Sequence, residues 1–417
     1  MTTEAKNSTF TIAILLIGAA LVLTGMGLFQ TLLPLRAGHE GFSATVVGLL
    51  GTAYFAGFIA GCLLGPGLVK TVGHIRAFAG VAALLAALIL LFPLKTEQYM
   101  WILLRFLTGA CVATVFMVIE SWLNEQSSDV ARGRVLSVYI IVANVATMAG
   151  QLLVNASGIA GPTLFLAVAF TMCLSIVPLA LTPTNEPSPI PSAKLDLKGQ
   201  FSISPVGVTG CFLVGMVEGA FWTLGPVFGQ LRGMSVFEVT LLMAAFVLGG
   251  TLSQWPLGRL SDRMDRRLII LPTAVGTVGT GLLIALWLPP SLLSTLAVAA
   301  LHGALMVPLY ALCLAHANDS VPTEKLVQVS GGLLLIYSVG AAIGPVIAAP
   351  LMNSGDAGAL FIFISVTLAL FALIIIYRLL WGPENERAEP SPFVPIPKTT
   401  QSVYELEVDD EVTAEAE

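Results

Sequence analysis

Apolar residues run along the chain in twelve long stretches, separated by charged residues or by prolines and glycines. A helix of about 20 predominantly apolar residues crosses the hydrocarbon core of a bilayer. The pattern therefore predicts twelve transmembrane helices and an all-α integral membrane protein. The predicted spans are residues 10–34, 45–69, 77–94, 99–123, 135–157, 160–182, 204–230, 238–258, 268–288, 291–316, 326–350 and 357–381.

The predicted helices form two groups of six. Between the sixth and the seventh lies a polar stretch with four prolines, which is typical of a linker. The expected organisation is an N-terminal six-helix bundle over residues 1–182, a cytoplasmic linker over 183–203, a C-terminal six-helix bundle over 204–381 and a disordered acidic cytoplasmic tail over 382–417.

Composition and charge support a membrane location. Only 11% of the 417 residues are charged, which excludes a soluble enzyme because a folded surface in water needs polar residues. Cytoplasmic loops carry the excess of Lys and Arg, and a cytoplasmic N-terminus puts 15 of these residues inside and 3 outside. We therefore expect a multi-pass protein of the inner membrane with both termini in the cytoplasm. No basic stripe indicates nucleic-acid binding, and the five cysteines lack metal-site spacing.

The two halves of the sequence also resemble each other. A shift of 192 residues aligns positions 27–68 with positions 219–260, with 13 identities in 42 positions. Both segments enter their bundle at the same ordinal helix and in the same orientation, as expected of a parallel repeat about an axis normal to the membrane. Two such bundles facing each other leave a central cleft, which is the architecture of a transporter.

The segment from Gly258 to Arg267, GRLSDRMDRR, lies between the eighth and ninth predicted helices. It resembles motif A, GxLxDRxGRR, of the major facilitator superfamily, which follows helix two and again helix eight in that family. The resemblance implies the fold of two pseudo-symmetric six-helix bundles and a gating role for this loop. Charge-assisted hydrogen bonds to a neighbouring helix end would break as the bundles rock; the alternative is an ordinary positive-inside loop. The implied gating residues are Gly258, Asp262, Arg263, Arg266 and Arg267.

The first-half counterpart of this motif is incomplete. It keeps Leu68, Gly73 and Arg76, but Lys70 stands where the family has an aspartate. We therefore expect the ionic gating to lie mainly in the second half, with Arg76 as the remaining first-half element.

Other stretches extend the resemblance. Arg105 and Gly109 resemble motif B, RxxxG, of helix four, whose buried arginine is linked in many proton-coupled members to coupling or substrate charge; a purely structural arginine is the alternative. Gly344-Pro345 resembles the end of an antiporter motif, but it lies in helix eleven rather than five and does not establish export. The stretches 119–124, 254–259 and 314–318 are similar to the YcaD-like branch of the superfamily.

Away from the helix ends, three charged residues lie within the predicted helices: Arg105, Glu120 and Glu218. Glu218 falls near the membrane midplane, with Trp222 within about 40° of it on the same helix face. A carboxyl beside an indole suits a substrate or proton site, whereas the alternative is a structural carboxyl bonded to a neighbouring helix. His302 also falls near the midplane, where it could pair with Glu218 as a proton relay or serve only in packing.

Glu120 lies 15 residues beyond Arg105, about 22 Å along the helix axis, so these two side chains do not pair directly. It is expected near the cytoplasmic mouth, either bonded to the Arg132 to Arg134 loop or at the substrate site. The fifth predicted helix carries a polar stripe of Ser137, Asn144, Gln151 and Asn155, which predicts cavity lining or interhelical hydrogen bonds. The glycines at positions 57, 61 and 65 predict close helix packing.

We therefore expect a monomeric secondary active transporter that moves a small organic solute by alternating access. The resemblance implies proton coupling, so the proton gradient would drive transport without a bound cofactor or metal. Efflux of amphipathic compounds and uptake of a polar metabolite both fit these features. The alternative is a membrane receptor or regulatory protein that kept the fold and lost transport. An enzyme is not expected, because the chain carries no HExxH, no GxSxG and no paired catalytic acids on one helix face. Direct use of ATP is not expected either, because nothing resembles a Walker A loop.

Overall fold

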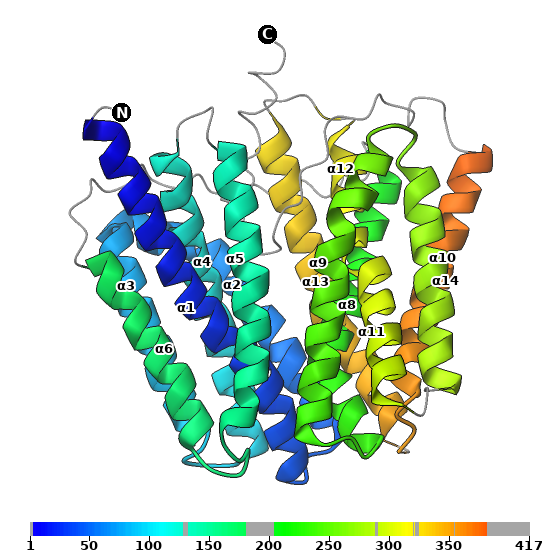
Figure 1. Ribbon diagram of the computed structural model, residues 1–417, viewed down its shortest axis with the longest axis horizontal. Helices are drawn as coiled ribbons and strands as arrows, with labels where there is room; N and C mark the ends of the chain where they lie inside the picture. The colour runs from blue at the N-terminus through cyan, green and yellow to red at the C-terminus, as the bar shows by residue number, and fades with distance from the viewer. Residues whose placement is uncertain are drawn as a thin grey trace. The chain divides into compact units, whose positions relative to one another are not determined.

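The computed structural model describes residues 3–127, 132–180, 204–287, 291–319, 321, 325–353 and 355–381 (Figure 1). The predicted linker and tail, residues 183–203 and 382–417, lie outside the described residues. The first half forms α1 (Thr3–His39), α2 (Ala44–Val72), α3 (His74–Leu91), α4 (Gln98–Gln126), α5 (Arg132–Leu153), the 3-10 helix η2 (Val154–Ala156) and α6 (Thr163–Ala180). The second half forms α8 (Pro205–Leu231), α9 (Val236–Ser261), α10 (Arg267–Leu286), α11 (Leu292–Met306), α12 (Pro308–Asn318), α13 (Leu326–Met352) and α14 (Ala359–Trp381).

Twelve spans among the described residues are long and apolar enough to cross a membrane, which confirms the predicted number and the all-α class. The tenth span differs from the expectation of one continuous helix, because α11 ends at Met306 and α12 begins at Pro308. A proline inside a helix removes a hydrogen-bond donor and crowds the preceding turn. The break at Val307 follows from that steric conflict.

The contacts of the chain define two compact units. Among the described residues, the first unit holds 3–29, 56–127 and 132–180, and the second holds 30–55 together with the helices from α8 onward. The α1–α2 hairpin formed by residues 30–55 thus belongs to the second unit although it lies in the first half of the chain. This hairpin is held in the second unit by hydrogen bonds that Gln230 Nε2 donates to Leu35 O (2.9 Å) and Thr52 Oγ1 donates to Ala342 O (2.7 Å). The domain bounds expected from the sequence stay a prediction.

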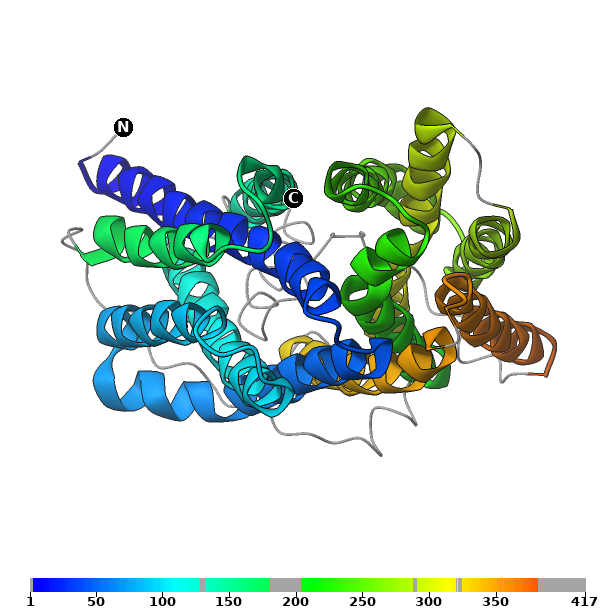
Figure 2. The ribbon, with the colours of Figure 1, turned by 90° about the horizontal axis from the view of Figure 1, so that it is seen from below.

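Each unit is a bundle of helices packed along their lengths. In the first unit α3 lies against both α4 and α6. In the second unit α8 packs on α13, α9 on α11 and α10 on α14 (Figure 1 and Figure 2). Helices that approach this closely need small residues at the contact. The predicted role of Gly57 and Gly61 is confirmed, since a Cβ on either would collide with the backbone of α4 at Phe106 or Ala110.

The internal repeat is visible in local geometry. Gly41 and Gly233, which are 192 residues apart, both adopt positive φ angles, 77° and 73°. Ser43 and Ser235 follow them, and each accepts a hydrogen bond from a backbone N–H of the next helix. The turn before α2 is therefore built like the turn before α9, because a left-handed residue favours glycine and a helix N-terminus favours serine.

Candidate functional site

Glu218 lies at the centre of α8 and is 1% exposed. The hydroxyl of Tyr337, on α13, donates a hydrogen bond to Glu218 Oε2 at 2.7 Å. The ring of Tyr310, on α12, packs against the ring of Tyr337 with 4.8 Å between the centroids. The carboxyl predicted from its rarity in an apolar helix thus binds a tyrosine of another helix, and a second tyrosine packs against that tyrosine.

Glycines on both helices bring Glu218 and Tyr337 together. A Cβ on Gly215 or Gly219 of α8 would collide with the backbone of α13, and a Cβ on Gly340 or Gly344 of α13 would collide with the backbone of α8. Two glycines four residues apart on each helix therefore interlock. The segment ending in Gly344-Pro345, noted above for its likeness to an antiporter motif, serves here as the contact between α13 and α8.

Sequence reasoning missed Tyr337 as the partner of Glu218. A tyrosine hydroxyl in the middle of an apolar helix needs a hydrogen-bond partner, and this signal singles out Tyr337 on α13. Trp222, one turn beyond Glu218, is half-buried and packs edge-on against Phe221 and Phe246. Its predicted role in lining a substrate cavity stays a prediction.

His302 on α11 does not pair with Glu218, so that expectation is wrong. Its Nδ1 lies 2.8 Å from Thr280 Oγ1 of α10, with which it shares a hydrogen bond. Its Nε2 is buried and has no hydrogen-bond partner among the described residues. The physical reason is the packing order, because α11 lies against α9 and α10 whereas the Glu218 carboxyl meets α13. Counting residues places Glu218 and His302 at a similar depth in the membrane, but their side chains bind different neighbouring helices.

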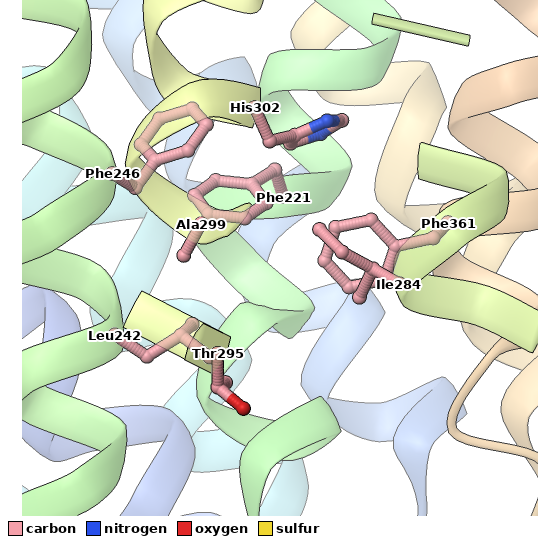
Figure 3. A pocket seen from close by; sticks show the side chains of 8 residues that line it. All are labelled: Phe221, Leu242, Phe246, Ile284, Thr295, Ala299, His302 and Phe361. Carbon is pink, nitrogen blue, oxygen red and sulfur yellow. The ribbon is translucent and has the colours of Figure 1, made fainter. Parts of the chain in front are cut away.

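A small cavity lies beside His302 within the second unit (Figure 3). The cavity has a volume of about 10 Å³, which is the room that one water needs. The ring of Phe361 lies edge-on to the ring of His302, with 5.4 Å between the centroids. The cavity is lined by Phe221, Leu242, Phe246, Ile284, Thr295, Ala299, His302 and Phe361.

Arg105 and Glu120, the two charged residues in the apolar part of α4, are both buried. Arg105 is 8% exposed, and its guanidinium lies 5.4 Å from the ring centroid of Phe29. Glu120 is fully buried and accepts a hydrogen bond from the hydroxyl of Tyr139, on α5, at 3.0 Å. Sequence reasoning also missed Tyr139, although it too is a tyrosine within an apolar helix. Glu120 in the first half and Glu218 in the second half thus each accept a hydrogen bond from a tyrosine of another helix. The expected bond of Glu120 to the Arg132 to Arg134 loop stays a prediction.

The polar stripe of α5 is not uniform. Gln151 is 1% exposed, whereas Asn144 is half-buried. Asn155 lies in η2 and Ser137 near the opposite end of the helix; both are exposed and bond to backbone carbonyls of their own segment. Local bonds of this kind satisfy a polar side chain without a neighbouring helix. The predicted cavity lining by Asn144, Gln151 and Asn155 therefore stays a prediction.

The motif A loop forms a dense charge network within the second unit. The side chain of Arg266 is fully buried and binds Asp319, at the end of α12, through two hydrogen bonds of 2.7 and 3.1 Å. Arg266 Nη1 also donates to Ser261 Oγ (2.8 Å) and to Asp262 Oδ1 (3.2 Å). Asp262 therefore bonds within the loop, and Arg266 makes the connection to a neighbouring helix end through Asp319, which sequence reasoning missed.

The remaining members of the loop differ in exposure. Gly258 is buried and Arg263 is exposed. Arg267 forms a bidentate pair with Asp265 (2.7 Å). Burial of the Asp265 carboxyl opposes its ionisation, but the hydrogen bonds and the charge of Arg267 outweigh burial and lower the pKa of Asp265 below its ordinary value. Its stabilising contribution is therefore present above that ordinary value and is lost as the pH falls through the lowered pKa.

The first-half counterpart makes its connection through a histidine. The 192-residue repeat puts His74 at the position of Arg266. His74 Nε2 lies 3.3 Å from Ser121 Oγ, so it joins the start of α3 to α4 much as Arg266 joins the start of α10 to the end of α12. Arg76 is exposed on α3.

Among the described residues, no cluster of three or more His, Cys, Asp or Glu side chains could hold a metal ion.

Comparisons with known proteins agree with this architecture. The sequence profile of the Major Facilitator Superfamily matches residues 15–239 and 207–410. The chain is 31% identical over 380 residues to the uncharacterized MFS-type transporter YcaD of Escherichia coli O139:H28 (strain E24377A / ETEC), which covers 88% of this chain and 96% of YcaD. This similarity confirms the resemblance to the YcaD-like branch.

Two solved structures share the fold at low sequence identity. A bacterial homologue of the human lysosomal transporter Spinster, in an inward-facing and occupied conformation, has a TM-score of 0.73 and 15% identity over 94% of this chain and all of its own. The fucose:proton symporter FucP of E. coli has a TM-score of 0.55 and 14% identity over 89% of this chain and 99% of its own. The chain belongs to the Major Facilitator Superfamily and is a multi-pass membrane transporter of a bacterial transporter family.

Proposed function

We propose that this protein is a proton-coupled secondary transporter of a small organic solute and that Glu218 is the group that binds the coupling proton. The observation that carries the proposal is a buried carboxyl at the centre of a membrane-spanning helix, with Tyr337 as its hydrogen-bond donor. Burying an ionisable side chain in a membrane costs free energy unless the side chain has a partner, so such residues mark functional sites. FucP is by its name a proton symporter with this fold, which supports proton coupling as a mode that the fold accommodates.

The surroundings of Glu218 suit a proton switch. When the carboxyl is ionised it accepts the Tyr337 hydrogen bond as a charged group, and such bonds are stronger than neutral ones. Protonation removes the charge and weakens that bond, so the contact between α8 and α13 depends on proton occupancy. The proposal therefore assigns to Tyr337 the positioning of the carboxyl.

The α1–α2 hairpin connects this contact to the end of the bundle. Thr52 of the hairpin donates to Ala342 O of α13, and Gly51 abuts Thr223 of α8. Asn353, just after α13, donates to Thr45 Oγ1 (2.6 Å) and accepts from the Thr45 N–H (3.3 Å). A change in the α8–α13 contact thus reaches the hairpin directly. We propose that release of these hydrogen bonds accompanies alternating access.

The test is a thermal-shift screen of the purified protein against metabolites and amphipathic compounds at pH 6 and pH 8. A ligand at 100 times its dissociation constant stabilises the folded state by about 2.7 kcal/mol. The expected result is a pH-dependent ligand effect that Glu218→Gln abolishes. Glu97→Gln is the matched control, because Glu97 lies in an exposed pair with Lys95.

A ligand found in this way is then tested for flux into proteoliposomes under an imposed pH gradient. Uptake that follows the gradient in the wild type and not in Glu218→Gln supports the proposal. Unchanged pH-dependent flux in Glu218→Gln removes Glu218 from the mechanism. Binding without flux in the wild type supports instead a receptor that kept the fold and lost transport.

A further inference from the structure

One exposed face of α9 changes in character along its length. Leu248 and Leu252 are 47% and 67% exposed, Trp255 is 63% exposed, and Arg259 in the last turn and Arg263 in the turn that follows the helix are also exposed. At 100° per residue Leu248, Leu252, Trp255 and Arg259 lie within about 60° of one another around the helix axis. Arg263 follows in the turn just after Ser261, the last residue of α9. The face therefore runs from apolar to aromatic to cationic.

Trp255 and Arg259 are in direct contact. The guanidinium carbon of Arg259 lies 4.2 Å from the ring centroid of Trp255, which is close enough for a cation–π interaction. Arginine is suited to phosphate because its planar donors match the phosphate oxygens. The tryptophan thus holds one such donor group at the end of the apolar stretch.

The carboxylates of the motif A loop do not neutralise this pair of arginines. Asp262 binds Arg266, and Asp265 binds Arg267. In the part of the chain that the structure describes, no acidic side chain forms an ion pair with Arg259 or Arg263. The loop therefore divides its arginines into two that are internally paired and two that present positive charge at the surface.

We propose that Trp255, Arg259 and Arg263 form a binding site for the headgroup of an anionic phospholipid, with the acyl chains along Leu248 and Leu252. The order of side chains matches the order of acyl chain, glycerol region and phosphate in such a lipid. Membrane-spanning helices carry tryptophan at the level of the headgroups, and basic residues next to them attract anionic lipids. A free phosphate lacks the acyl chains and would leave the apolar part of the face unused.

Trp255 provides a spectroscopic probe of the site. The full chain is labelled with 5-fluorotryptophan and purified in detergent, and the ¹⁹F resonance of Trp255 is assigned as the one missing from Trp255→Phe. Dioleoyl phosphatidylglycerol, dioleoyl phosphatidylcholine and inorganic phosphate are then titrated separately. We expect the Trp255 resonance to shift saturably with phosphatidylglycerol and to respond little to the other two.

The arginines set the size of the expected effect. Each basic residue near an anionic surface contributes about fivefold in affinity, so Arg259→Gln with Arg263→Gln should weaken phosphatidylglycerol binding by about 25-fold. Arg76→Gln, an exposed arginine on α3, is the matched control and should leave the titration unchanged. Both replaced arginines are exposed, and an unchanged elution volume in size-exclusion chromatography verifies that the double variant is folded.

Three outcomes would overturn the proposal. An equal response to phosphatidylcholine would show that the headgroup charge is not recognised. A saturable response to inorganic phosphate alone would show a site for a free anion. An unchanged phosphatidylglycerol titration in the folded double variant would show that the two arginines do not bind the lipid.

Discussion

Replacement of Asp319 by asparagine tests the buried charge network of the motif A loop. The Arg266 side chain is fully buried and the Asp319 side chain is 4% exposed, so neither charge is screened by water. Removal of one partner of a buried ion pair typically destabilises a protein by about 3–5 kcal/mol. Asp262 still binds Arg266 at 3.2 Å, and so we expect the lower end of that range, about 3 kcal/mol.

The free energy of unfolding can be measured by titration with sodium dodecyl sulfate in dodecyl maltoside micelles. Glu97→Gln serves as the control, because Lys95 and Glu97 form a pair that is 60% exposed on both sides. Exposed pairs contribute about 0–1 kcal/mol. The same loss of a carboxylate charge should therefore cost much less at Glu97 than at Asp319.

A double-mutant cycle with Arg266→Gln separates the pair from its surroundings. Side chains in direct contact couple by about 0.5–3 kcal/mol, and we expect the upper part of that range for this bidentate pair. If Asp319→Asn costs no more than the exposed control, the buried ion pair does not stabilise the fold. If the effects of Asp319→Asn and Arg266→Gln are additive, the two side chains do not interact.

Three further predictions concern helix contacts. Tyr337→Phe should lower the free energy of unfolding by about 1.5–3 kcal/mol, because it removes a hydrogen bond to a buried carboxylate. Tyr139→Phe should have a similar effect in the first unit. An unchanged free energy of unfolding in either variant would contradict the corresponding hydrogen bond. Gly344→Ala should lower the free energy of unfolding by about 1–3 kcal/mol, because the added Cβ would collide with the backbone of Met216. Gly279→Ala adds a Cβ with nothing near it and should stabilise α10 by up to about 1 kcal/mol. The same denaturant titration measures both variants, and equal effects would exclude the close contact at Gly344. Asn353→Ala should speed amide hydrogen exchange at Thr45, measured by mass spectrometry, because the Thr45 N–H loses its acceptor; an unchanged exchange rate would show that the hairpin is held elsewhere.

The number and the type of the helices could be predicted because they depend on local properties. A stretch of about 20 apolar residues crosses a bilayer whatever its neighbours are, and all twelve predicted spans are present. Prediction was weaker where a single residue changes the backbone. The span predicted over residues 291–316 is broken at Val307, although Pro308 was visible in the sequence.

The candidate site was predicted in part. Glu218 stands out in the sequence because charge is rare in apolar helices, and the structure places it at the centre of α8. Its partner Tyr337 is 119 residues away, and His302, which the sequence offered either as a partner or as a packing residue, shares a hydrogen bond with Thr280 instead. Depth along each helix can be estimated by counting residues, but the direction in which a side chain points depends on how the helices are rotated against each other.

By itself the sequence determined that the chain spans a membrane, that its two halves are similar in sequence and that it belongs to a transporter superfamily. These conclusions follow from hydropathy, spacing and motifs, which are properties of the linear chain. Only the tertiary structure decided that Asp319 binds Arg266 and that the glycines of α13 lock against α8 beside Glu218. Such pairings join residues far apart in the chain, and they exist because close packing selects one rotation of each helix among many that the same apolar pattern allows.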